Sequence, residues 1–188
     1  EELTAAAETP VSAEEQALLR TLQKETNCQD ASTIIFTSGT TAQPKGVLLS
    51  HYGILNDARS VALGMHWSES DIMALAMPMF HCSGLTCGVM IGMCDQMPTV
   101  ILRYFSPRVV MAAIEKYRCT VFNAVPSMLL IMKDHPDRTK YDLSSFVSGT
   151  MGGSAISAEE FAEVCRVFGL KNYLSVYGQT ECSPIVCM

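Results

Sequence analysis

Short apolar runs alternate with amphipathic segments along most of this chain, and this alternation limits the folds open to it. Seven runs of three to six residues stand out. They cover residues 33–36, 46–49, 72–77, 99–102, 120–125, 146–148 and 173–176. Because apolar residues fill them almost continuously, we expect strands that are buried on both faces. The sequence therefore predicts an α/β fold, with a mostly parallel sheet and helices on both faces.

Start and stop signals mark three of the helical segments. Two of them open with a capping box, in which a hydroxyl and a carboxylate three residues apart bond to each other's backbone N–H groups. The two pairs are Ser12 with Glu15 and Ser157 with Glu160. In the third segment Pro107 follows Ser106, as a proline does in the first turn after a cap. Gly169 supplies a stop signal for the segment that begins at Ser157.

Composition excludes several classes of protein. The chain has 188 residues, of which 48% are hydrophobic, and this content rules out a disordered chain. Its 13 Lys and Arg against 19 Asp and Glu give a net charge of −6, so a basic face for nucleic acid is not expected. Seven of the acids but only two of the bases lie in the first thirty residues. We therefore expect a leading acidic helix and connection over 1–30, and the main α/β unit over 31–188.

Cysteine spacing and one uncharged stretch bear on location. The eight cysteines form no C-x-x-C pair and no zinc-type cluster with histidine, which favours reduced thiols and a cytoplasmic protein. Residues 72–94 contain no charged side chain except for the titratable His81, but Pro78 and three glycines interrupt them. We interpret this stretch as a buried strand followed by a buried helix, with no transmembrane segment.

The loop over residues 37–46 is the most informative one, because it combines hydroxyls, glycines and a lysine. Backbone N–H groups, hydroxyl donors and a mobile cation suit a polyphosphate. A Walker A loop is rejected, since Pro44 replaces its second glycine and Gly46 stands where Ser or Thr must hold magnesium. A polar hairpin tip is the alternative that carries no function.

Two later loops follow predicted strands in the same way. Residues 148–156 contain paired glycines, which let a planar ligand lie against the backbone but also occur in ordinary tight turns. Residues 177–181, with the sequence Tyr-Gly-Gln-Thr-Glu, place an aromatic ring, a hydroxyl and a carboxylate at one sheet edge. Glutamate is a natural oxygen ligand for magnesium. By itself each of these loops is a weak signal.

Together the loops carry a family resemblance. TSGTTAQPKG resembles the phosphate-loop signature of the adenylate-forming (AMP-binding) superfamily, and YGQTE resembles its later signature. The block MPMFHCSG resembles the family's intervening segment. The segment VPSMLLIMKDHPDRTKYDLSS followed by SGTMGGSAIS is most similar to medium- and long-chain fatty acyl-CoA synthetases. The resemblance covers roughly residues 30–188. It implies the central portion of the large N-terminal domain, and we expect the small C-terminal domain to be absent.

The resemblance implies a role for each matching residue. The phosphate-binding set would be Thr37, Ser38, Gly39, Thr40, Thr41 and Lys45. The adenine and α-phosphate set would be Gly152, Gly153, Ser154, Tyr177, Gly178 and Thr180. Glu181 would hold the metal, and His81 would lie beside the carboxylate or gate the acyl tunnel, unless it is a core histidine at a helix start. Lys45, Thr180, Glu181 and His81 are thus the expected catalytic residues. Ala42 departs from the family's usual glycine, which puts closure of the first loop in doubt.

The activity implied is ATP-dependent activation of a carboxylic acid, most simply a fatty acid, to an acyl-adenylate, followed by thioester formation with coenzyme A. ATP, Mg²⁺ and coenzyme A are the implied cofactors. Two alternatives stay open: a domain that loads an aryl or amino acid onto a carrier protein, and a non-catalytic nucleotide-binding remnant. Small molecules are the expected partners, nucleic acid is not, and peripheral membrane contact and the oligomeric state stay open. Methionines such as Met77 and Met97 line either an adaptable acyl pocket or simply the core.

Overall fold

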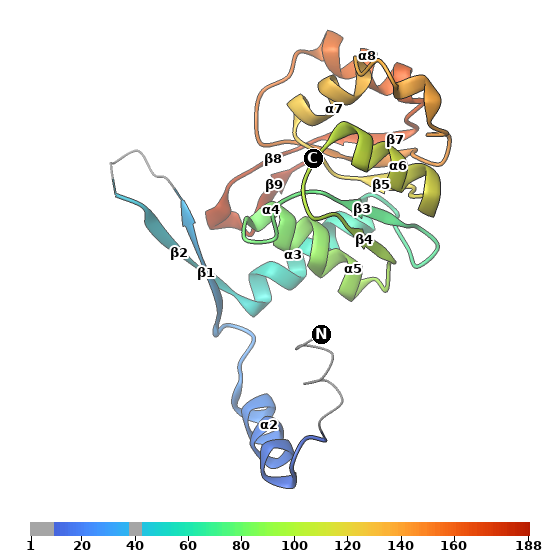
Figure 1. Cartoon of the computed structure of the whole chain (residues 1–188). Helices are drawn as coiled ribbons and strands as arrows, with labels where there is room; N and C mark the ends of the chain where they lie inside the picture. The colour runs from blue at the N-terminus through green and yellow to red at the C-terminus, as the bar shows by residue number, and fades with distance from the viewer. Residues whose placement is uncertain (1–9, 38–42) are drawn as a thin grey trace.

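A five-stranded parallel sheet forms the centre of the computed structural model, which describes residues 10–37 and 43–188 (Figure 1). The strand order is β4-β3-β5-β6-β7, and every neighbouring pair is parallel. The strands are β3 (Met73–Leu75), β4 (Thr99–Ile101), β5 (Val121–Phe122), β6 (Ser148–Met151) and β7 (Asn172–Ser175). Those between the edges are buried throughout, as the continuous apolar runs predict. The predicted α/β class is confirmed.

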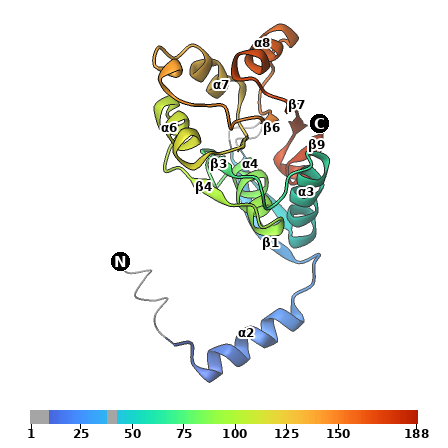
Figure 2. The ribbon, with the colours of Figure 1, turned by 90° about the vertical axis from the view of Figure 1, so that its right-hand side faces the viewer.

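Helices cover both faces of this sheet. On one side lie α6 (Pro107–Tyr117), α7 (Pro126–Lys133) and α8 (Ala158–Phe168), and on the other α3 (His51–Gly64) and α5 (Ile91–Cys94) (Figures 1 and 2). Each face has its own core, because successive strand residues point to opposite sides. Met73 and Val121 belong to the core under α3, whereas the next residues, Ala74 and Phe122, belong to the core under α6–α8. A short 3₁₀ turn, η2 (Arg138–Lys140), follows α7.

The first two predicted strands do not join this sheet, which corrects the expectation of one sheet. Strands β1 (Ala31–Thr37) and β2 (Lys45–Ser50) pair with each other, antiparallel, as a separate hairpin. A parallel pair would need a crossover of a dozen or more residues between them, and the connection is shorter. Their side chains alternate, so Ile35 and Leu49 are buried while Phe36 is 71% exposed.

The helix signals are confirmed, with one correction. Helix α2 (Ala13–Glu25) opens with the predicted capping box, yet none of its residues is buried, and it stands apart from the rest of the molecule (Figure 2). Helix α8 opens with its own capping box and ends at Gly169, whose φ of 69° suits glycine. At α6 the predicted cap is wrong, because the Ser106 hydroxyl makes no capping bond. The predicted place of Pro107 in the first turn of this helix is confirmed.

The uncharged stretch forms the buried strand and helical segment that the sequence predicts. After β3 come α4 (Cys82–Gly84), the π-helical turn η1 (Leu85–Met90) and α5, in one continuous helical run. Thr86, Cys87 and Ile91 are buried within it. No helix in the described part of the chain has both the length and the apolar character needed to cross a bilayer.

The strand predicted over 146–148 begins later in the structure, because the core includes residues outside the ladder. Phe146, expected in a strand, lies before β6 and is fully buried against the rings of Phe122, Phe168 and Tyr173. The hydroxyl of Tyr173 on β7 lies 2.8 Å from the carbonyl oxygen of Phe122 and 3.2 Å from that of Thr150. This hydroxyl therefore links the three strands that lead into the site described below.

Replacement of Tyr173 by Phe should test that link. The ring would still fill the core, but two buried carbonyl groups would lose their shared donor, so we expect the free energy of unfolding to fall by about 1–2 kcal/mol. Urea denaturation followed by circular dichroism measures the change. Tyr104, which is 61% exposed, provides the control: Tyr104→Phe should leave the midpoint unchanged. If Tyr173→Phe had the same urea midpoint as the wild-type chain, the hydroxyl would not stabilise the contact between these strands.

Candidate functional site

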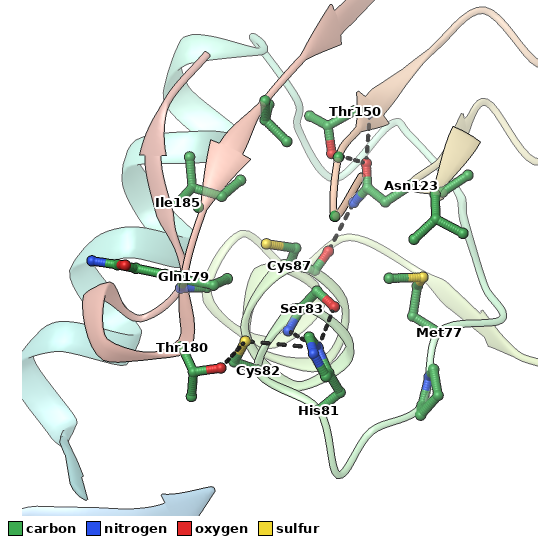
Figure 3. Close-up of a pocket in the computed structure, with 18 of the residues that line it drawn as sticks. Met77, His81, Cys82, Ser83, Cys87, Asn123, Thr150, Gln179, Thr180 and Ile185 are labelled. Carbon is green, nitrogen blue, oxygen red and sulfur yellow. Dashed lines mark hydrogen bonds between the residues drawn. The ribbon is translucent and has the colours of Figure 1, made fainter. Parts of the chain in front are cut away.

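A cavity of about 440 Å³ opens where the parallel strands end. Its walls come from the segments that follow β3, β5, β6 and β7 and from the α4–η1 helical run (Figure 3). Open parallel sheets bind their ligands at this position. The apolar part of the wall consists of Met77, Phe80, Val125, Met128, Val176 and Ile185. None of the lining residues is Asp, Glu, Lys or Arg, so the cavity suits an uncharged group.

His81 lies at the mouth of this cavity, at the start of α4. Its Nδ1 accepts a hydrogen bond from the backbone N–H of Ser83 at 3.2 Å and lies 2.7 Å from the Ser83 hydroxyl. The imidazole thus caps the helix while its ring stays exposed. His81 lines the cavity with an exposed side chain, so it is not a buried core histidine, and its role beside the carboxylate or at the acyl tunnel stays a prediction.

Cys82 connects the helical run to the last loop of the chain. Its Sγ lies 3.4 Å from the hydroxyl oxygen of Thr180, and both residues line the cavity (Figure 3). Burial raises the pKa of the Cys82 thiol and, even more, that of Cys87, which lines the same wall. Both thiols are therefore neutral at physiological pH, and the wall that they form carries no charge.

Asn123 occupies the floor of the cavity and uses both ends of its amide. Its Nδ2 donates to the carbonyl oxygen of Cys87 at 2.9 Å. Its Oδ1 accepts from the backbone N–H of Thr150 at 2.9 Å and from the Thr150 hydroxyl at 3.0 Å. The wider winding of a π-helix displaces carbonyl groups from the ordinary α-helical ladder, and here a side chain supplies a donor to one of them. Asn123 therefore holds η1 at a set distance from the end of β6.

The paired glycines after β6 form the opposite wall. Gly152 and Gly153 line the cavity, whereas the expected third member, Ser154, is exposed beyond the lining; their role against adenine stays a prediction. A Cβ atom on Gly152 would lie 2.8 Å from the carbonyl oxygen of Val176, so no larger residue fits without a shift. Gly153 has a φ of 86°, which also favours glycine.

The last signature folds into a small unit at the edge of the cavity. Strand β8 (Tyr177–Gly178), the 3₁₀ turn η3 (Thr180–Cys182) and strand β9 (Ile185–Cys187) form an antiparallel hairpin. Gly178, Gln179 and Thr180 line the cavity, and Thr180 is only 8% exposed. Tyr177 and Glu181 lie outside the lining with exposed side chains, so the structure does not place them at the cavity itself.

The described residues of the first signature lie at and beside the ends of strands β1 and β2. Thr37 ends β1, Lys45 begins β2, and the two are register partners. Lys45 is exposed, and neither residue lines the cavity. The rest of the loop lies outside the described residues: Ser38, Gly39, Thr40, Thr41 and Ala42, the residue that differs from the family's usual glycine. Their phosphate-binding role stays a prediction.

Sequence reasoning missed the polar residues that connect the walls. Asn123 follows β5 and Thr150 lies within β6. A lone asparagine within the apolar run 120–125 was the available signal. Cys82 has no signal beyond its place beside His81. The methionines divide between the two interpretations: Met77 lines the cavity, while Met97 is 2% exposed in the core and Met93 is 70% exposed.

Asn123→Asp should test the hydrogen bonds that connect η1 with β6 through Asn123. The change removes the donor to the Cys87 carbonyl oxygen, while the side chain keeps almost the same shape. At pH 7 a buried carboxylate would face a carbonyl oxygen, and we expect the free energy of unfolding to fall by about 2–4 kcal/mol. Burial would raise the pKa of this Asp in the folded state, so the loss should shrink as the pH falls and the carboxyl gains a proton.

Thermal denaturation across pH 4–8 measures this change. Thr150→Val is the matched variant, since it removes only the hydroxyl bond to Asn123 and adds no charge; its effect should be smaller and independent of pH. A pH-independent loss for Asn123→Asp would contradict the assignment.

With the geometry described, comparison with known proteins is informative. The model of the family described as AMP-binding enzyme matches residues 1–188. YngI of Bacillus subtilis (strain 168) is 36% identical over 168 residues, which are 88% of this chain and 31% of YngI. The mitochondrial medium-chain acyl-CoA ligase ACSF2 of Danio rerio is 38% identical over 171 residues, or 89% of this chain and 28% of the ligase. The chain thus spans less than a third of the length of these curated relatives.

A solved structure agrees. O-succinylbenzoate coenzyme A synthetase (MenE) from Bacillus subtilis, determined in complex with ATP and magnesium ion, superposes with a TM-score of 0.72. It is 30% identical, and the match covers 86% of this chain and 33% of that one. The parallel sheet and the surrounding helices are therefore a known arrangement.

Proposed function

The chain belongs to the AMP-binding enzyme family, and we propose that it forms the acid- and nucleotide-binding part of a site that activates a carboxylic acid with ATP. The observation that carries this proposal is the convergence at one cavity of Thr180 and Gly178 from the last signature with Gly152 and Gly153 from the middle one. They come from segments far apart in the sequence. The similarity to acyl-CoA ligase ACSF2 supports coenzyme A as the acceptor.

The chemistry has two balanced steps. A carboxylate oxygen attacks the α-phosphorus of ATP, and pyrophosphate leaves, which yields the acyl-adenylate. The thiol of coenzyme A then attacks the acyl carbon, AMP leaves, and the thiol proton is released. Both reactants of the first step are anions, so the site needs donors and positive charge near the phosphates. In our proposal Thr180 donates to the α-phosphate, and Lys45 with the loop 37–41 neutralises the phosphates that leave.

Glu181 is the residue that would hold Mg²⁺. Its carboxylate is exposed and takes no hydrogen bond within the described residues, so its oxygens are free for a cation. In the described part of the chain no cluster of three acidic, histidine or cysteine side chains is placed to bind a metal. This fits Mg²⁺, which commonly takes one or two carboxylates and completes its shell with phosphate oxygens and water. When bound, the ion would offset phosphate charge.

The cavity indicates the class of acid. Its wall combines aliphatic, methionine and aromatic side chains without a formal charge, so we propose a fatty acid or another acid with an uncharged apolar tail. A carrier-protein adenylation domain for amino acids would have to accommodate an α-ammonium group, and no carboxylate lines the cavity to receive one. A cytoplasmic location stays a prediction, since the name of the ACSF2 relative places that protein in mitochondria.

Calorimetric titration with a non-hydrolysable octanoyl-adenylate mimic tests the site without requiring turnover. We expect saturable binding to the wild-type chain, and Thr180→Val should weaken it about tenfold by removing one phosphate donor. Thr139→Val is the control, because Thr139 is exposed and does not line the cavity. A folded wild-type chain that binds AMP but not the mimic would support the nucleotide-binding remnant instead.

A second titration series tests the apolar tail. A mimic with a carboxylate at the far end of the same chain should bind at least about tenfold more weakly than the octanoyl form, because the cavity offers no charged partner to offset desolvation. An α-amino analogue should be weakened similarly. Equal affinity for the three mimics would mean that the tail does not enter the cavity, and it would overturn the proposed acid class.

A further inference from the structure

Helix α3 contacts the β8–β9 hairpin along one face, through three positions. A Cβ atom on Gly53 would lie 2.7 Å from the Ser183 hydroxyl oxygen, and one on Gly64 would collide with the side chain of Met188. Between these close approaches, Oδ2 of Asp57 accepts a hydrogen bond from the backbone N–H of Ile185 at 3.3 Å. Asp57 is the charged side chain in this contact.

The hairpin needs such a support. It is a two-stranded sheet of its own, and isolated two-stranded hairpins are marginally stable. A bond from the backbone N–H of Val176 to the carbonyl oxygen of Met151 attaches its first strand to the parallel sheet. The second strand, β9, has Asp57 as its hydrogen-bond partner on α3. Ile185, which donates that bond, lines the cavity (Figure 3), and so does Pro184 before it.

The carboxyl of Asp57 is held there against a desolvation cost. Burial raises its pKa to about 6, and the bond from Ile185 opposes that rise only in part. The described ion pairs do not include it. The titratable groups that face it are the thiols of Cys82 on α4 and Cys87 on η1, both neutral because burial raises their pKa values. Simple stability would favour an uncharged residue at this position.

We propose that Asp57 is a positioning residue for the adenylation site: by accepting the Ile185 N–H it fixes the β8–β9 hairpin against α3 and thereby sets Thr180 and Gly178 at the cavity. Asp57 does not line the cavity and touches no reacting group, so its action passes through the hairpin. The consequence for catalysis rests on the proposed function, whereas the contact itself does not. An experiment on each is therefore needed.

Proton NMR of the ¹⁵N-labelled chain tests the contact without a ligand. The Ile185 amide resonance should shift with a midpoint near pH 6, as the carboxylate that it contacts gains a proton. The amides of Gly178 and Thr180 should shift with the same midpoint, because the hairpin moves as a unit. Asp57→Asn should abolish all three titrations, and Tyr52→Phe, at an exposed position on another face of α3, should leave them intact. Titration of Ile185 alone, or of none of the three, overturns the proposal.

Binding of the octanoyl-adenylate mimic tests the consequence. At pH 7.5 Asp57→Asn should weaken binding about three- to tenfold, because an amide oxygen is a poorer acceptor than a carboxylate. The same variant should raise the thermal midpoint, since the neutral amide avoids the desolvation cost. A merely structural role predicts that affinity follows stability, whereas positioning predicts opposite signs.

The pH dependence sharpens this comparison. An acid whose pKa is raised on folding destabilises the folded state as the pH rises from its unfolded value toward about 6. Below pH 5 folded wild-type Asp57 is protonated and resembles Asn, so the affinity ratio should vanish there, whereas the difference in midpoint should vanish only as the pH falls below the ordinary pKa of 3.8. Equal affinities at pH 7.5 overturn the proposal. If the wild-type chain binds no mimic, the proposed function fails, and the NMR titration still decides whether Asp57 positions the hairpin.

Discussion

Burial of the parallel sheet on both faces is the constraint on which the rest of this structure depends. Once α3 and α5 cover one side and α6, α7 and α8 cover the other, polar groups have access to solvent only at the strand ends. The segments that leave the strands at their carboxyl ends must then find hydrogen-bond partners for their backbone N–H and C=O groups at the same edge of the sheet. The cavity lies there because the segments after four strands meet without filling the space between them.

A buried polar junction at this point does two tasks at once. The amide of Asn123 satisfies a carbonyl group of the π-helical turn and two groups of Thr150, so it removes unpaired buried groups. The same three bonds fix the spacing between the π-helical turn η1 and the end of β6, which leads into the glycine wall. The shape of the cavity is thus coupled to the hydrogen bonds of Asn123. If either wall moved, one of these bonds would break, and water could not replace it because the groups are buried.

Much of the fold follows from local sequence, and the site follows only in part. Alternation of apolar runs and capping pairs such as Ser157 with Glu160 predicts the α/β class, because these signals act within a few residues. The separate β1–β2 hairpin and the place of Phe146 outside the ladder depend on tertiary packing, which no local window contains. Gly152 and Thr180 were found through a family resemblance. Asn123 and Asp57 were not, since their roles arise from contacts between segments 27 and 128 residues apart.

The different environments of the cysteines have a practical consequence for chemical labelling. Reaction with iodoacetamide or a maleimide requires the thiolate, and burial suppresses that form at Cys82, Cys87 and Cys119. Cys28, Cys182 and Cys187 are exposed. A dye or spin label added to the native chain will therefore collect on its outside and leave the cavity wall unmodified. Cys182 directly follows Glu181 and lies outside the cavity lining, so a probe attached there reports on the signature loop.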